Sequence, residues 1–142
     1  MNHEEQLTER KTRVLVAEDH MLLRESIVYF LRVKGYKVYD AFNGADAYAL
    51  IDRCRAAGVP IDLLITDMEM PAVSGRELIG RLRAEGHELP VIIMGNAMEA
   101  SGCAHMKQDG NIGILDKPFR LPLLDRCIRD MLQMQSVRKD EA

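Results

Sequence analysis

Three short apolar runs in this chain each end in charged side chains, and this pattern constrains the possible folds most strongly. Glu18 and Asp19 follow the first run, Asp67 follows the second, and Lys117 follows the third. If the runs are parallel strands of one sheet, these side chains meet at its carboxyl edge, where open α/β sheets bind ligands. The runs are Val14–Ala17, Leu63–Thr66 and Ile112–Asp116.

Strand signals alternate with helical apolar stripes along the chain, which predicts an α/β fold. Continuously apolar strands are typical of parallel sheets that are covered by helices on both faces. We therefore expect a doubly wound, five-stranded parallel sheet, although the pattern alone does not give the strand order. The expected strands are Arg13–Ala17, Tyr36–Tyr39, Ile61–Thr66, Val91–Met94 and Ile112–Leu115.

Helices are expected between these strands. Gly35, Gly58 and Gly86 follow helical apolar stripes and are natural helix stops. A helix is also expected over Met98–Lys107, although Gly102 interrupts its apolar spacing. The stripes of the other helices begin at Leu23, Ala47, Gly75 and Leu124.

Length and composition predict one cytoplasmic domain. The chain has 142 residues, 47% of them apolar, and a net charge of -3, which argues against nucleic-acid binding. We expect a flexible lead-in over residues 1–12, the domain over 13–134 and a short charged tail over 135–142. No membrane span or secretory signal is visible. The three widely spread cysteines indicate free thiols in a reducing compartment.

Each charged feature also has an ordinary structural interpretation. Glu18 and Asp19 could be a polar strand end or a helix cap, Asp67 a turn residue, and Lys117 part of an exposed turn. Their joint occurrence at three strand ends favours a functional site instead. Because clustered carboxylates repel one another, the site needs cations, which a divalent metal and Lys117 would supply. Such a pocket suits phosphoryl transfer.

Two further candidates are interpreted as structural. His20 follows the acid pair and is expected to be a solvated residue at the start of a helix. Cys103 and His105 provide too few ligands for a zinc site.

The charged motifs together resemble the receiver domain of bacterial two-component response regulators. The resemblance covers Thr12 to Met134, nearly the whole chain, and implies a flavodoxin-like strand order of 2-1-3-4-5. The motifs are Glu18-Asp19, Asp67-Met68-Glu69-Met70-Pro71, Gly75 and Lys117-Pro118-Phe119.

The resemblance implies a role for each charged residue. Asp67 would accept a phosphoryl group from a phosphohistidine on a sensor histidine kinase or histidine phosphotransfer protein. Asp19 and Asp67 would bind Mg²⁺ directly, Glu18 would help through water, and the backbone carbonyl of Glu69 would complete the protein ligands. Lys117 would pair with the phosphoryl oxygens.

Three positions concern the geometry and the switch of such a domain. The peptide bond before Pro118 is expected to be cis. Receivers usually carry Ser or Thr after the fourth strand and an aromatic residue in the fifth, whereas this chain has Gly95 and Ile114. These substitutions predict an atypical response to phosphorylation.

The expected function is that of a stand-alone receiver that signals through protein contacts and touches neither nucleic acid nor membrane. It would not be an enzyme, beyond its own phosphorylation and dephosphorylation. One alternative is a pseudo-receiver, an interaction module with little phosphorylation. Another is a phosphohydrolase with Asp67 as nucleophile and Glu69 as acid/base.

Overall fold

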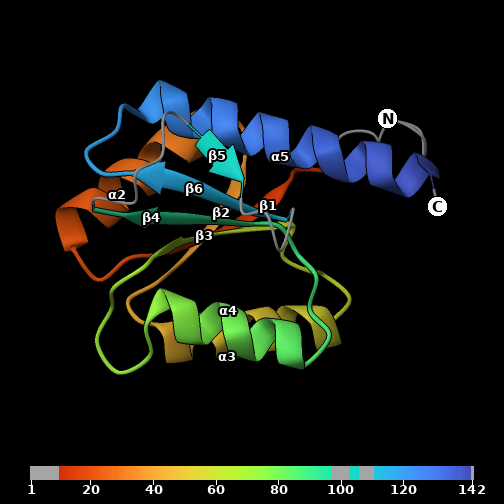
Figure 1. Cartoon of the computed structure of the whole chain (residues 1–142), viewed down its shortest axis with the longest axis horizontal. Coiled ribbons are helices and arrows are strands. Elements are labelled where there is room, and N and C mark those ends of the chain that lie inside the picture. Colours follow the sequence, from red (N-terminus) through yellow and green to blue (C-terminus); the bar gives the residue numbers. More distant parts are fainter. Residues whose placement is uncertain (1–9, 97–102, 106–110, 142) are drawn as a thin grey trace.

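The computed structural model describes residues 10–96, 103–105 and 111–141, and for 103–105 and 136–141 it describes the backbone alone. They form one sheet between two layers of helices (Figure 1). The strands are β1 (Arg13–Ala17), β2 (Lys37–Ala41), β3 (Leu63–Asp67), β4 (Val91–Gly95), β5 (Cys103–His105) and β6 (Ile112–Asp116).

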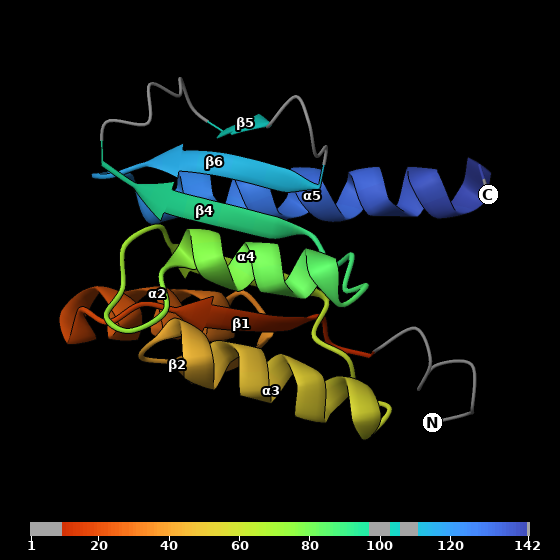
Figure 2. The same cartoon turned by 60° about the horizontal axis from the view of Figure 1, so that its bottom comes forward.

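The strand order is β2-β1-β3-β4-β6-β5. The first five in this order are parallel, whereas β5 pairs antiparallel with β6 at the edge. Because β6 is the fifth strand of the parallel set, the predicted flavodoxin-like order 2-1-3-4-5 is confirmed. Figure 2 shows β5 as the outermost strand beside β6.

Two helices cover each face of the sheet, as Figure 1 shows. Alternate residues of β1 face opposite layers: Val14 and Val16 belong to the core under α2 and α5, and Leu15 and Ala17 to the core under α3 and α4. All four are fully or almost fully buried, which explains why the strand is continuously apolar. The helices are α2 (Met21–Val33), α3 (Gly44–Ala56), α4 (Gly75–Ala84) and α5 (Leu121–Glu141).

Side-chain caps define where three helices begin. Asn43 Oδ1 accepts from the Asp46 N–H at 2.8 Å, and Ser74 Oγ accepts from the Glu77 N–H at 3.2 Å. His20 caps α2 through Nδ1, which accepts from the Leu23 N–H at 3.4 Å. The histidine beside the acid pair therefore has a structural role at the start of α2.

The helix expected over Met98–Lys107 is wrong for residues 103–105. There the backbone forms β5, with Cys103 opposite Leu115 and His105 opposite Gly113. The exposed edge of β6 offers unpaired backbone groups, and pairing with them overrides a weak local helix pattern. The rest of that expected helix lies outside the described residues.

Residues on both sides of the expected domain, 13–134, belong to the described structure. Helix α5 continues to Glu141, so the expected tail from residue 135 is helical up to that point. At the other end, the Arg10 Nη2 lies 3.1 Å from Asp62 Oδ2, which also accepts from the Arg13 N–H at 2.8 Å. In the described part of the chain, no helix is long and apolar enough to span a membrane.

A partly buried hydrogen bond ties the segment between α2 and β2 to α5. The Tyr36 hydroxyl donates to Asp125 Oδ1 at 3.1 Å, and Asp125 is 5% exposed. Arg129 Nη2 lies 3.2 Å from the other oxygen of this carboxylate. Burial, followed by the charge and the hydrogen bond of Asp125, raises the pKa of Tyr36 from 10.0 to about 12.

We predict that Tyr36→Phe lowers the free energy of unfolding at pH 7 by about 1–2 kcal/mol, because a buried carboxylate loses a donor. Urea unfolding measures this, with Tyr29→Phe, at a side chain that is 73% exposed, as the control. Since the folded state raises the Tyr36 pKa, its contribution is complete below pH 10 and is lost as the pH rises through about 12. Equal stabilities of the two variants would contradict this interpretation.

Candidate functional site

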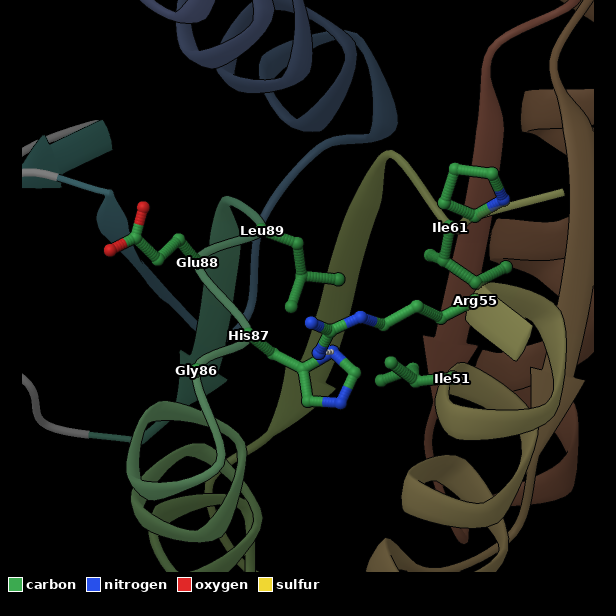
Figure 3. A pocket seen from close by; sticks show the side chains of 8 residues that line it. Ile51, Arg55, Ile61, Gly86, His87, Glu88 and Leu89 are labelled. Carbon is green, nitrogen blue, oxygen red and sulfur yellow. Dashed lines mark hydrogen bonds between the residues drawn. The ribbon is translucent and has the colours of Figure 1, made fainter. Parts of the chain in front are cut away.

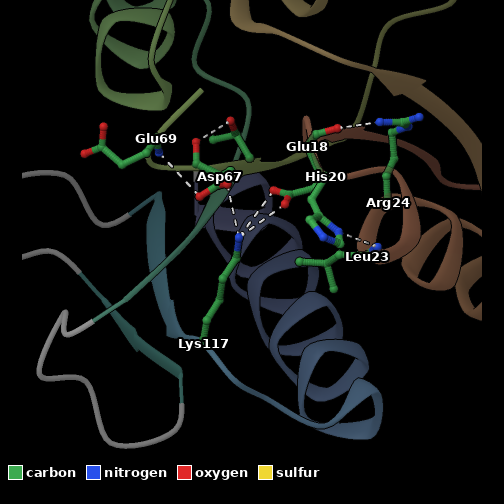
Figure 4. A network of polar contacts seen from close by, with 8 residues as sticks. Glu18, His20, Leu23, Arg24, Asp67, Glu69 and Lys117 are labelled. Atoms are coloured by element: carbon green, nitrogen blue, oxygen red, sulfur yellow. Dashed lines mark hydrogen bonds and ion pairs between the residues drawn. The ribbon is translucent and has the colours of Figure 1, made fainter. Parts of the chain in front are cut away.

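Glu18, Asp67 and Lys117 meet at the carboxyl edge of the sheet (Figure 4), and Asp19 belongs to the same cluster. Lys117 Nζ lies 3.1 Å from Asp67 Oδ2 and 3.3 Å from Glu18 Oε1. Glu18, Asp19 and Asp67 each offer a carboxylate oxygen, and these oxygens lie within 4.8 Å of one another. Parallel pairing of β1 with β3, and of β4 with β6, puts the carboxyl ends of these strands on one side.

Glu18 is the most buried of these acids, at 1% exposure. Its pKa rises from 4.5 to about 7, first because of burial and then because of the hydrogen bond and the negative charge of Asp67. Lys117 acts in the opposite direction. Lys117 supplies one positive charge beside three clustered carboxylates, so the cluster favours an additional cation.

The donor set fits Mg²⁺. Hard carboxylate oxygens are the ligands that Mg²⁺ prefers, and it usually takes only one or two carboxylates and keeps several waters. Glu18 and Asp67 are buried, whereas Asp19 is exposed at the mouth of the cluster, where water has access. The cluster therefore combines carboxylate ligands with an exposed side at Asp19 where a cation could keep its waters.

Backbone contacts fix the segment around Asp67. The Thr66 hydroxyl donates to the Asp67 carbonyl at 3.0 Å, and the Glu69 N–H lies 3.4 Å from Asp67 Oδ1. The Gly75 N–H donates to the Met68 carbonyl at 2.9 Å. A Cβ on Gly75 would lie 2.1 Å from the Asp67 carbonyl oxygen, so the start of α4 can approach β3 this closely only with glycine.

Lys117 is held where β6 ends. Its N–H donates to the Gly95 carbonyl at 2.7 Å, which extends the pairing of β4 and β6 by one residue. The peptide bond between Lys117 and Pro118 is cis. The lysine side chain is 18% exposed and points back across the edge to Glu18 and Asp67 (Figure 4).

The two atypical positions lie on neighbouring strands. Gly95 ends β4 in a buried position. Ile114 lies opposite Ile93 in the pairing of β4 with β6. Both isoleucines line a pocket of about 300 Å³ between the sheet and α4, together with Met68 and Ile79.

A second cluster, formed by Asp52, Glu85 and His87, lies where α3 and α4 end. Arg55 Nη1 lies 3.3 Å from His87 Nδ1, and both residues line a pocket of about 230 Å³ (Figure 3). Because a guanidinium only donates, a hydrogen bond there requires Nδ1 to accept and leaves the proton on Nε2, which faces Asp52 at 3.8 Å. This arrangement opposes metal binding through Nε2 and fits a structural contact between the helices.

Sequence reasoning did not find one residue at the acidic edge. Arg24 is 7% exposed and its Nη1 donates to the Glu18 carbonyl at 2.9 Å. The helical spacing does distinguish this arginine: Arg24 lies on the buried face of α2 with Ile27, Val28 and Leu31, whereas Arg32 is exposed. A charged residue in phase with that apolar stripe, five residues after Asp19, was the signal that could have suggested a buried polar contact.

The match to known proteins identifies the family. The model of the response regulator receiver domain matches residues 14–129, and the chain belongs to this family. Receiver domains are signalling domains of two-component systems that interact with histidine kinases and bind Mg²⁺ in an acidic pocket.

Individual relatives agree with this assignment. The response regulator MprA of Mycobacterium ulcerans is 32% identical over 130 residues, covering 92% of this chain and 54% of that protein. The crystal structure of the receiver domain from the hybrid histidine kinase CckA has a TM-score of 0.68 at 27% identity, covering 84% of this chain and 98% of that one. The response regulator TrrA of Thermotoga maritima, crystallised with Mg²⁺-BeF, has a TM-score of 0.65 at 24% identity, covering 86% and 99%. The chain spans about half the length of the response regulators it matches.

We predict that Gly75→Ala lowers the free energy of unfolding by about 2–3 kcal/mol, because the added methyl group would overlap the Asp67 backbone. Gly80→Ala, on the same helix, is the matched control. Its Cβ would have nothing within 4 Å, so it should gain about 0.5–1 kcal/mol from helix propensity. Urea unfolding compares both with the wild type, and a similar effect of the two substitutions would contradict the close approach of α4 to β3.

Proposed function

We propose that this receiver domain accepts a phosphoryl group on Asp67. The observation that carries the proposal is the contact of 3.1 Å between Asp67 Oδ2 and Lys117 Nζ, inside a cluster of three carboxylates at the carboxyl edge. A lone carboxylate would repel an incoming phosphoryl group, whereas this one lies beside a fixed ammonium group. Asp67 is 8% exposed, so it is shielded but lies at the surface edge of the sheet.

Each residue has a distinct task in the proposed reaction. A carboxylate oxygen of Asp67 attacks phosphorus as the bond from phosphorus to the donor breaks. Lys117 neutralises phosphoryl oxygens as a point charge. Asp19 and Asp67, with the backbone carbonyl of Glu69, would hold Mg²⁺, and Glu18 would assist through water. When bound, Mg²⁺ supplies positive charge that screens the nucleophile from the phosphoryl group.

The proposed donor is a phosphohistidine on a sensor histidine kinase or a histidine phosphotransfer protein. The family relationship supports this, as does the similarity to a receiver domain that is itself part of a hybrid histidine kinase. The phosphorylated domain would then signal through contacts with another protein.

The second candidate function is an interaction module with little phosphorylation. Gly95 and Ile114 favour it. Glycine has no side chain and isoleucine has neither a hydroxyl group nor an aromatic ring, so neither residue can couple a phosphoryl group to the rest of the fold through such a group. The phosphohydrolase alternative has less support. The backbone N–H of Glu69, rather than its carboxylate, is the group that approaches Asp67.

We predict that incubation with acetyl phosphate and Mg²⁺ phosphorylates the wild type and that Asp67→Asn abolishes this uptake. Asp19→Asn should weaken Mg²⁺ binding and phosphorylation together, because it removes a charged ligand. Asp130→Asn, at an exposed acid on α5, is the control. Intact mass with site mapping measures uptake. An unphosphorylated wild type would favour the interaction module, and a label at another carboxylate would exclude Asp67 as the acceptor.

We also predict a small conformational response when beryllofluoride binds with Mg²⁺. A ligand shifts an equilibrium only through contacts that differ between the two states, and Gly95 offers no side chain for such a contact. Changes in NMR chemical shift should be confined to the surroundings of Asp67, Gly95 and Lys117. A rearrangement that extends through Ile114 to α5 would show that the fold couples these regions in another way.

A further inference from the structure

Arg24 joins three segments around the acidic cluster. Its Nη1 donates to the Glu18 carbonyl at 2.9 Å, as Figure 4 shows, and its Nε lies 3.6 Å from Asp40 Oδ2. Its guanidinium carbon lies 4.0 Å from the centre of the Phe42 ring. One side chain of α2 therefore holds the end of β1 against the end of β2 and the residue after it.

The contact with Glu18 determines the direction of the next residue. The Glu18 N–H donates to the Ala41 carbonyl at 3.1 Å, which continues the pairing of β1 with β2. Arg24 then holds the Glu18 carbonyl, which belongs to the same planar peptide as the Asp19 N–H. The residue that precedes Asp19 is thus held through both its N–H and its carbonyl group.

Asp19 needs this support because its own side chain has none. Within the described residues, its exposed carboxylate makes no hydrogen bond or ion pair, in contrast to Glu18 and Asp67, which contact Lys117. The direction of the Asp19 carboxylate therefore depends on its backbone. Burying a guanidinium is costly unless it is well paired, so a purely packing role would suit an apolar side chain better than Arg24.

We propose that Arg24 is a positioning residue for the cation site: by holding the Glu18 carbonyl, it directs the Asp19 carboxylate toward the site that Asp19 shares with Asp67. The proposal rests on the function proposed above, since it assigns Asp19 to Mg²⁺. It also predicts the direction in which loss of Arg24 changes the Mg²⁺ affinity, and a purely electrostatic effect would change that affinity in the opposite direction. A nearby positive charge opposes cation binding, so removing the charge alone would tighten Mg²⁺ binding. Loss of positioning would weaken it.

The test is calorimetric titration of the full chain with Mg²⁺. Arg24→Ala should raise the Mg²⁺ dissociation constant about tenfold, as is typical when a residue that supports a metal ligand is removed. The matched control is Arg32→Ala. Arg32 lies on the same helix and also donates to a backbone carbonyl, that of Val38 in β2, at 3.1 Å. The control loses the same charge and the same kind of contact, and its dissociation constant should stay close to that of the wild type.

A second measurement does not depend on the metal. Loss of the hydrogen bond at the Glu18 carbonyl should shift the Asp19 amide resonance of the Mg²⁺-free protein, and Arg32→Ala should leave that resonance in place. If Arg24→Ala fails to fold, Arg24→Lys takes its place, because it keeps the charge and most of the stem. A lysine cannot reproduce the planar fork over Phe42, so about a threefold weaker Mg²⁺ binding is expected.

The outcomes separate the two proposals. Unchanged or tighter Mg²⁺ binding by the Arg24 variant that folds, with normal binding by the wild type, overturns the positioning role alone. Equal weakening in Arg32→Ala overturns it as well, because the effect would then follow from general destabilisation. Absence of Mg²⁺ binding by the wild type contradicts the proposed function itself and removes the basis for a role of Arg24.

Discussion

Charge compensation at the carboxyl edge of the sheet is the constraint on which the other features of this domain depend. Glu18 and Asp67 are both largely buried, and Lys117 contacts them at 3.3 and 3.1 Å. A buried carboxylate is destabilising unless it is paired, and burial, followed by the hydrogen bond and charge of Asp67, raises the pKa of Glu18 to about 7 although Lys117 acts against this. The acids would relieve their repulsion by moving apart, so the strand ends that carry them must be held in place.

The sheet provides this restraint. The strands β1, β3 and β4 lie in the middle of the sheet, and the side chains of β3 and β4 are buried along their whole length. Asp67 lies opposite Met94 in the register of β3 and β4, and the Lys117 N–H binds the Gly95 carbonyl one step farther along. Moving one acid by a fraction of an ångström would disturb a close-packed interior. The carboxylates therefore stay close together, and a bound cation would relieve their repulsion.

The sequence predicted the parts of this arrangement that follow from periodicity. Parallel strands that end in Glu18, Asp67 and Lys117 had to bring these side chains to one edge, and the structure does so. The strand β5 could not be predicted, because it depends on pairing with β6 rather than on its own residues. Arg24 was missed for a similar reason. Its partner is a backbone carbonyl, and a hydrophobic pattern carries no information about which carbonyl a polar side chain will reach.

Gly95 and Ile114, the two atypical positions, determine how a charge added at Asp67 could change the conformation of other parts of the domain. Gly95 offers only its backbone, and its carbonyl already accepts the Lys117 N–H. Ile114 and Met68, the residue directly after Asp67, line the same largely apolar pocket. Apolar contacts of this kind are not directional, so they cannot select one side-chain orientation as a hydrogen bond does. Within the proposed function, a signal from Asp67 would therefore leave the site through the charge on Lys117 and through the backbone that carries Met68.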